Sequence, residues 1–476
     1  MVIMSEMIVR GLKFLLFTYF ILKYSFIYAI LFYILSDYSY HYILYYLFNI
    51  EEVTAQEYTM VALRNENKSI MTGYFVLESF NEEKIKNMII EKAIKKFKRL
   101  RMKMTFSLGG FYWEESTIEE AIKQIKIMPE LNLQNNEDLQ NYSLKHHAIP
   151  FKLNEFPFEF HLIRHGKEKA ILFLKFDHIL GDGIGLLGLL IAMADNYSLA
   201  LYPKLHELSL VTKLLVYITL PYYYLKGIIA SAKLYYEKTP FRVGEDLKRS
   251  NVKSCAMSKN FEFDSFYKIC KQHKMTFNDL IMAILAKAAK LTFQKYTPEG
   301  NFETKELVLS QTVSLRPMPE SLETHKIIND VSAIPFTLKL IDDPIKERKI
   351  IQKSLDKSPF EAIALLKMLG LIKLLIPSFL LNAFMLRSMD NLDIAVSNVP
   401  GPRKELYFAG IKATDLVIMP TANCMNFMVM VYSYNEKFQF TAISDTATQV
   451  TPKSFIKFIE NEVEDIISNY CIFITC

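Results

Sequence analysis

The chain has 476 residues, of which 51% are hydrophobic, and its 56 basic and 51 acidic residues leave a net charge of +5. This composition excludes a disordered or collagen-like chain, and the small positive charge gives no electrostatic case for binding nucleic acid. Five cysteines without a CxxC pair are too sparse for a disulfide framework and favour a reducing, cytosol-facing environment. The length predicts two or three domains, or one large unit of two lobes.

Much of the apolar excess lies near the N-terminus. From Phe14 to Leu35 the one charged residue is Lys23, and a second run from Tyr38 to Ile50 carries no formal charge. About 20 apolar residues are enough to span a bilayer, and both runs are rich in the tyrosine and phenylalanine side chains that favour the headgroup boundary. We therefore expect residues 1–50 to form a hydrophobic membrane anchor.

Several arrangements of this anchor are open. A cleaved signal peptide is disfavoured, because no clear small-x-small cleavage site follows the apolar run. A single span, with Arg10 and Lys13 keeping the N-terminus in the cytosol, would place everything after Asp37 in the lumen. A re-entrant hairpin or an interfacial anchor would keep the rest of the chain in the cytosol, and a buried core helix is the remaining alternative.

The rest of the chain alternates between strand-like and helix-like patterns. A strand ends at Leu77, and Asn81 precedes a helix whose acidic first turn and basic last turn suit the helix dipole. Periodicity and turn residues predict further strands at Ala170–Asp177, Leu307–Ser314 and Asp393–Ser397, helices at Gly183–Ala194 and Phe277–Phe293, a hairpin at Met425–Asp445, and a C-terminal helix with Phe455, Ile459, Val463 and Ile466 on its apolar face. This mixed order predicts an α/β or α+β architecture of two lobes.

Two more apolar stretches and one polar stretch lie between these elements. Leu208–Tyr236 and Ala362–Leu386 each carry lysines at intervals and one proline, a pattern typical of amphipathic helices that lie on a membrane or pack into a core. Glu237–Ser258 is polar and basic and contains Pro240 and Gly244, which makes it the best candidate for a linker.

The residues that carry chemistry follow the strand that ends at Asp177. His178 stands at the end of this strand, and Asp182 and Gly183 open the next helix, in the pattern HxxxDG. Histidine can accept a proton at neutral pH, and a general base is worth about 10²–10⁴ in rate. Asp182 can cap the helix and fix the turn, and Gly183 and Gly185 allow close backbone approach. A hydrogen-bonded histidine at a strand end is the alternative.

Six short motifs occur in order along the chain. They are Pro157-Phe158-Glu159, Asp177-His178 with Asp182-Gly183, Thr276-Phe277-Asn278-Asp279, Ser314-Leu315-Arg316-Pro317, Asn329-Asp330-Val331-Ser332, and Ser397-Asn398-Val399-Pro400-Gly401-Pro402 with Gly410, Pro420, Ser433-Tyr434 and Asp445 after it. By these motifs the chain resembles the wax ester synthase/diacylglycerol acyltransferase (WS/DGAT) family of O-acyltransferases, from about Glu52 to Ser468. The Ser-Asn-Val-Pro-Gly-Pro run is the most specific of them.

The resemblance implies an α/β fold like that of the coenzyme-A-dependent acyltransferases, with two chloramphenicol-acetyltransferase-like lobes that meet along a tunnel. We expect an N-terminal lobe with the HxxxDG motif at residues 51–240 and a C-terminal lobe at residues 255–476. The resemblance implies that His178, as the second histidine of the family motif, deprotonates an alcohol whose oxygen attacks a fatty acyl-CoA thioester. Acyl-CoA is then a co-substrate, and neither a cofactor nor a metal is expected.

Supporting roles also follow from the resemblance. It implies that three motif residues are structural: Asp182, Gly183 and Arg316. We expect Arg316 to pair with Asp182. It also implies three candidates for shaping the substrate site: Asn278, Ser397 and Asn398. For Asn278 the alternative is a helix N-cap, and for the other two it is a tight turn before Pro400.

The chain departs from the family pattern at three positions. Asp177 stands where the motif has its first histidine, Glu159 replaces a tryptophan, and Ile328 replaces the glycine before Asn329. Because the family uses the second histidine as the base, we expect activity to survive the change at Asp177. Substrate preference is open.

The leading functional hypothesis is a membrane-associated O-acyltransferase that acts on a long-chain alcohol or diacylglycerol and forms wax ester or triacylglycerol. The alternatives are transfer to a short alcohol, sterol or amine, and a non-catalytic relative that binds lipid or acyl-CoA. A single span would place His178 in the lumen, away from the cytosolic acyl-CoA pool. We therefore expect a hairpin or interfacial anchor at the endoplasmic reticulum, with the catalytic lobes facing the cytosol.

Overall fold

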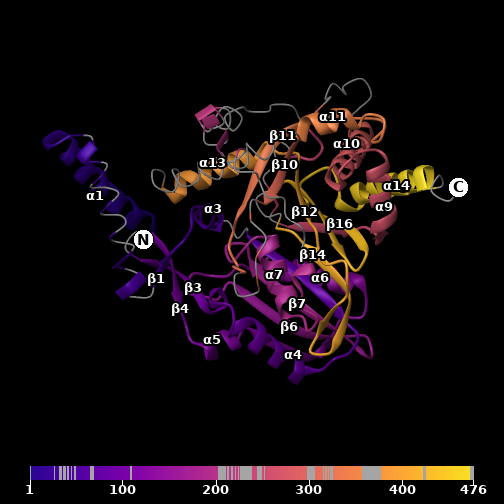
Figure 1. The fold of residues 1–476 in the computed structure, drawn as a ribbon, viewed down its shortest axis with the longest axis horizontal. Coiled ribbons are helices and arrows are strands. Elements are labelled where there is room, and N and C mark those ends of the chain that lie inside the picture. Colours follow the sequence, from indigo (N-terminus) through magenta and orange to yellow (C-terminus); the bar gives the residue numbers. More distant parts are fainter. Residues whose placement is uncertain are drawn as a thin grey trace.

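The structure is a computed structural model of the whole chain. It describes residues 2–25, 50–64, 69–107, 110–201, 239–243, 249–250, 252–296, 306–314, 325–355, 377–421 and 425–471, together with isolated positions between these ranges. The folded body is built on two large sheets, each covered by helices, and α1 (Val2–Lys23) projects away from it (Figure 1).

The first large sheet has six strands in the order β13-β14-β2-β7-β6-β5. Their bounds are β2 Ile70–Leu77, β5 Ile125–Asn132, β6 Phe158–His165, β7 Lys169–Asp177, β13 Leu406–Phe408 and β14 Ile411–Met419. The prediction of a strand over Ala170–Asp177 is confirmed, because β7 pairs with β2 on one side and β6 on the other. Strands β13 and β14 come from far along the sequence and complete this sheet, because β14 pairs with β2 and β13 pairs with β14. The two sheets therefore do not divide at one point of the chain.

The second large sheet has seven strands, six of them in the order β11-β10-β12-β15-β16-β8, and β9 also pairs with β16. Their bounds are β8 Lys253–Met257, β9 Phe261–Glu262, β10 Glu306–Ser314, β11 Val331–Lys339, β12 Ile394–Val399, β15 Phe427–Tyr434 and β16 Lys437–Asp445. The predicted hairpin is confirmed: β15 and β16 join at Asn435 and Glu436, which both have positive φ, as a tight hairpin turn requires. Part of the predicted linker is wrong, because Lys253–Met257 pair with β16 as strand β8.

A small three-stranded sheet, in the order β1-β4-β3, lies beside the first large sheet. Its strands are β1 Ile50–Glu52, β3 Met102–Ser107 and β4 Gly110–Glu115. Trp113, the single tryptophan of the chain, is fully buried here in a cluster with Ile179, one residue after the motif histidine.

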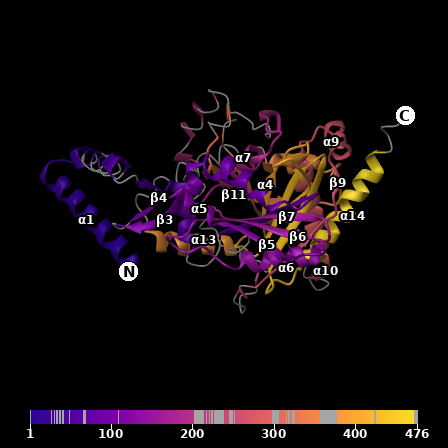
Figure 2. The ribbon, with the colours of Figure 1, turned by 90° about the horizontal axis from the view of Figure 1, so that it is seen from below.

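Helices cover both large sheets (Figure 2). Their bounds are α3 Ala55–Arg64, α4 Glu82–Ile89, α5 Ile118–Ile122, α6 Asn136–His147, α7 Gly183–Met193, α9 Phe263–Gln272, α10 Phe277–Tyr296, α11 Arg348–Leu355, α13 Ser378–Asp390 and α14 Pro452–Cys471. The helix predicted after Asn81 is confirmed at its start, where the Asn81 side chain accepts a hydrogen bond from the backbone N–H of Lys84. Beyond Ile89 it widens into a π-helical turn at Ile90–Ile94, followed by a 3₁₀ turn at Lys98–Arg101.

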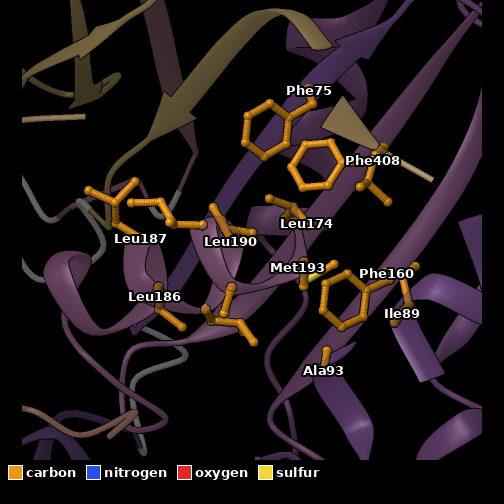
Figure 3. Packing of buried hydrophobic residues seen from close by; sticks show 14 of the residues in the cluster. Phe75, Ile89, Ala93, Phe160, Leu174, Leu186, Leu187, Leu190, Met193 and Phe408 are labelled. Atoms are coloured by element: carbon orange, nitrogen blue, oxygen red, sulfur yellow. The ribbon is translucent and has the colours of Figure 1, made fainter. Parts of the chain in front are cut away.

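Two apolar cores hold the sheets together, and β15 contributes to both. Its alternate residues Met430 and Tyr432 face the core of the first sheet, whereas Val429 and Val431 face the core of the second. This follows from the two-residue period of a strand. Helix α7 contributes leucines and Met193 to the first core, and Figure 3 shows Met193 beside Phe160 and Phe75 beside Phe408 in the same cluster.

The N-terminal region differs from a simple spanning helix. Helix α1 ends at Lys23, so it stops inside the predicted apolar run from Phe14 to Leu35. In the part of the chain that the structure describes, no helix is both long enough and apolar enough to cross a bilayer. Many positions between 26 and 49 lie outside the described residues, so the second apolar run is only partly described.

The two later apolar stretches are only partly described. Of Leu208–Tyr236, scattered helical positions are described, and most of them are exposed apolar side chains: Val211, Leu214, Leu215, Ile218, Tyr222 and Leu225. Of Ala362–Leu386, the positions before 377 lie outside the described residues, and the rest belongs to α13. Leu381 of α13 is buried in the cluster of Trp113, whereas Leu380 is half exposed, so this helix packs one face against the core.

Candidate active site

His178 stands at the end of β7, where the strand turns into α7. Its backbone N–H donates to the carbonyl oxygen of Ser69 over 2.7 Å, and the Leu180 N–H closes the turn on the Asp177 carbonyl over 2.9 Å. The His178 side chain is half-buried. The predicted cap is confirmed, since the Asp182 carboxylate accepts a hydrogen bond from the Gly185 N–H over 2.7 Å at the start of α7.

The expected partner of Asp182 is present. Arg316, 134 residues further along the chain, donates from Nη2 to Asp182 Oδ2 over 3.0 Å, and both side chains are buried. The same carboxylate oxygen accepts from the backbone N–H of Asp330 over 2.7 Å. Arg316 also donates to the carbonyl oxygens of Lys326 and Ile328. Asp182 and Arg316 therefore hold residues 325–330 against the motif turn.

Gly183 and Gly185 are required by this close packing. A Cβ atom at Gly183 would lie 3.1 Å from a methyl group of Val399, which stands at the end of β12. A Cβ atom at Gly185 would lie 3.1 Å from Arg316 Nη2 and from the Ile328 carbonyl oxygen. Both positions are close approaches rather than left-handed turns, so the prediction of tight backbone contact holds at each.

Asn329 is a site residue that the sequence analysis named only as part of a motif. Its Nδ2 donates to the carbonyl oxygens of His178 over 2.8 Å and Ile179 over 3.1 Å. Its Oδ1 lies 3.0 Å from His178 Nδ1. The separation of 151 residues from His178 leaves no local signal for this contact, and only the order of the two motifs pointed to it.

The three substrate-site candidates lie on the second lobe. Asn398 Nδ2 donates to Asn278 Oδ1 over 3.4 Å, which brings the start of α10 to β12. The N-cap alternative for Asn278 is wrong, because Thr276 and Asp279 cap α10 reciprocally. The tight-turn alternative for Ser397 and Asn398 is also wrong, since both lie within β12 and pair with β15. Among the hydrogen bonds of the described residues, none joins these three side chains to His178.

Asp177 and Glu159, two departures from the family pattern, have separate partners. Asp177 is buried and accepts hydrogen bonds from the Ser69 hydroxyl over 2.6 Å and the Ile179 N–H over 3.1 Å. Glu159 is bonded to Lys126 over 2.5 Å and to His161 Nε2 over 3.0 Å. Burial opposes ionisation of Glu159, but these two hydrogen bonds and the positive charges of Lys175 and Lys126 together lower its pKa to about 2.

Within the described ranges, one cluster has metal-binding residue types. Ligand atoms of His146, Glu159 and His161 lie within 4.8 Å of one another, and burial lowers the pKa of His146 to about 4. However, Lys126 already pairs with Glu159, and the ammonium group of Lys175 lies 3.9 Å from the same carboxylate. Two positive charges therefore compete with a cation for this carboxylate, and the cluster is accounted for as a buried ion-pair network.

Comparison with known proteins agrees with this architecture. Residues 329–467 match the WS/DGAT C-terminal domain. The O-acyltransferase WSD of Acinetobacter baylyi is 23% identical over 214 residues, which are 44% of this chain and 45% of that protein. The match thus spans less than half of the length of this curated relative.

Two solved structures are similar in fold. The wax ester synthase/diacylglycerol acyltransferase from Marinobacter aquaeolei VT8 superposes with a TM-score of 0.58 at 17% identity, over 88% of this chain and 99% of that one. A mutant starter condensation domain of rhizomide synthetase RzmA, in complex with C8-CoA, gives 0.59 at 14% identity, over 88% and 94%. The resemblance predicted from the motifs is therefore confirmed: residues 329–467 match the WS/DGAT C-terminal domain, and the chain has a two-lobed fold similar to that of a solved WS/DGAT structure.

Proposed function

We propose that this protein is an O-acyltransferase that moves a fatty acyl group from acyl-CoA to a lipid alcohol, either a long-chain alcohol or diacylglycerol. The observation that carries the proposal is the geometry of His178. This histidine stands at the end of β7, its ring bonded at Nδ1 to Asn329, within a fold shared with a WS/DGAT enzyme. The products would be a wax ester or triacylglycerol together with free coenzyme A.

The proposed reaction needs one general base. His178 Nε2 accepts the hydroxyl proton of the acceptor alcohol. At the same time the hydroxyl oxygen of the acceptor attacks the thioester carbonyl carbon and forms the C–O bond. The tetrahedral intermediate then collapses, the C–S bond breaks, and the imidazolium returns the proton to the departing coenzyme A sulfur. Asn278, Ser397 and Asn398 are the proposed substrate-site residues, because β12 meets the motif helix at Val399 and Gly183. Asp182, Gly183 and Arg316 keep the turn in place.

A membrane is the proposed location of the reaction. Exposed apolar side chains cover α1, among them Leu12, Leu15 and Leu22, and Arg10 and Lys13 supply positive charge. An exposed apolar helix with basic residues favours the interface of an anionic bilayer. We place the protein on the endoplasmic reticulum with its catalytic lobes facing the cytosol, where acyl-CoA and lipid acceptors meet.

Replacing His178 by alanine tests this proposal. Full-length protein in membranes, given one labelled acyl-CoA and a panel of acceptors, should form ester with long-chain alcohol or diacylglycerol. His178→Ala should lower this rate by about 10²–10⁴-fold, whereas His273→Ala, at the end of α9, should leave it unchanged. Full activity of His178→Ala would refute the assignment of the base.

The same acceptor panel separates the alternatives. Turnover with a short alcohol, a sterol or an amine in place of a lipid alcohol would replace the proposed acceptor. Binding of acyl-CoA without turnover on any acceptor would identify a non-catalytic relative.

A further inference from the structure

Asn329 makes two hydrogen bonds to the motif histidine and a third to Ile179, and these bonds fix how its amide lies against the imidazole. Asn329 is buried, with 3% of its surface exposed, and precedes β11 in the segment that Arg316 holds against the motif turn. Its amide faces the backbone carbonyls of His178 and Ile179 on one side and the imidazole on the other.

The two carbonyl oxygens fix which way the Asn329 amide points. A carbonyl oxygen only accepts hydrogen bonds, so the group that faces both of them must be the NH₂ of the amide. The opposite orientation would place Oδ1 against two acceptors and leave all three oxygens without a donor. Asn329 Oδ1 therefore points at the imidazole.

An amide oxygen opposite His178 Nδ1 fixes the position of the proton on the ring. Because Oδ1 is an acceptor, Nδ1 must carry a hydrogen, and the distance of 3.0 Å is that of an N–H···O hydrogen bond. In the neutral imidazole only one nitrogen is protonated. The lone pair therefore lies on Nε2, the nitrogen that points away from Asn329.

We propose that Asn329 is a positioning residue that holds His178 as its Nδ1–H tautomer and so presents the Nε2 lone pair to the substrate. The catalytic consequence of this inference rests on the proposed acyl transfer, whereas the tautomer of His178 follows from the hydrogen bonds alone. The contact crosses between the motif turn and the segment before β11. It follows that the base is set only when residues 325–330 are docked on the turn by the Asp182–Arg316 pair.

The ring nitrogens can be observed directly. In full-length protein labelled with ¹⁵N-histidine, solid-state NMR separates protonated from unprotonated ring nitrogens, and His178→Gln identifies the His178 signals among the nine histidines. We expect His178 in the wild type to show a protonated Nδ1 and an unprotonated Nε2 at neutral pH. A protonated Nε2 with an unprotonated Nδ1 would overturn the inference, whether or not the protein turns over acyl-CoA.

Variants then test the role of the side chain. Asn329→Leu removes the acceptor, so we expect a mixture of the two tautomers and a fall in kcat of roughly 10²-fold, with KM changed little. Asn329→Asp keeps an oxygen opposite Nδ1 and should retain the Nδ1–H tautomer in folded protein, although its second carboxylate oxygen then faces the two carbonyl oxygens to which the NH₂ group donated. Trp113 fluorescence checks that each variant is folded. An unchanged tautomer and unchanged kcat in folded Asn329→Leu would refute the positioning role.

If the wild type shows the expected tautomer but forms no ester with any acceptor, the proposed function fails while the assignment of the tautomer stands. The two failures are therefore distinguishable.

Discussion

The buried ion pair between Asp182 and Arg316 allows a quantitative test of the site architecture. The two side chains are 1% and 7% exposed, and they join the start of α7 to the chain just after β10. Asp182 accepts from three donors, namely Arg316 and the backbone N–H groups of Gly185 and Asp330. Removing either partner leaves a charge in a place from which water is excluded.

The expected losses differ between the two partners. Asp182→Ala leaves the guanidinium without its counter-charge, which costs about 3–5 kcal/mol, and removes a helix cap worth about 1 kcal/mol. Arg316→Met leaves a carboxylate that keeps two backbone donors, so we expect a loss near the lower limit, about 3 kcal/mol. The double variant should lose at least about 2 kcal/mol less than the two single losses together, because the second substitution removes the unpaired charge.

Urea unfolding followed by Trp113 fluorescence measures these losses, because this single tryptophan is buried in the cluster that contains Ile179. Asp342→Ala is the matched control, since that aspartate pairs with Lys290 but is 80% exposed, and its effect should be far smaller. Single losses below about 1 kcal/mol, or losses that add within about 0.5 kcal/mol, would refute the account of a coupled buried pair.

Three further predictions concern pH, packing and the membrane. Burial lowers the pKa of His147 to about 4 from an ordinary 6.5. Between these two pH values the folded state therefore binds fewer protons than the unfolded state. The contribution of His147 to the free energy of unfolding should be complete above pH 6.5 and lost as the pH falls towards 4. Replacing His147 by Gln should make the free energy of unfolding depend less on pH, as measured by urea titrations at several pH values. An unchanged dependence on pH would contradict the lowered pKa of His147. Gly401→Ala places a Cβ 1.9 Å from the Ser433 carbonyl oxygen, so it should lower the free energy of unfolding by about 1–3 kcal/mol and reduce the Tm. An unaltered Tm would disprove this prediction. Replacing the exposed Leu15 and Leu22 of α1 by Glu should weaken sedimentation of the full chain with anionic vesicles, and equal sedimentation would argue against α1 as the membrane contact.

Features that depend on neighbouring residues could be predicted from the sequence. The apolar run from Ala170 predicts β7, and the position of Asp182 predicts the cap of α7, because strands and caps are formed by residues close together in the chain. The turn residues Asn435-Glu436 likewise predict the hairpin of β15 and β16. The order of the motifs predicted the resemblance to the WS/DGAT family, whose C-terminal domain residues 329–467 match.

Features that depend on distant segments could not be predicted in this way. The sequence does not show that β13 and β14 complete the sheet of β2, because strand pairing across more than 300 residues has no local pattern. The helix α1 ends at Lys23 although the apolar run continues, so composition alone does not set the end of a helix.

The site shows the same division between sequence and structure. By itself, the sequence determined that a histidine follows a strand, that an aspartate caps the next helix, and that the chain carries the motifs of an acyltransferase family. Only the tertiary structure decided that Asn329 holds the ring of His178. The physical reason is that a hydrogen bond needs two groups within about 3 Å, and for residues 151 positions apart only the packing of the lobes brings them to that distance.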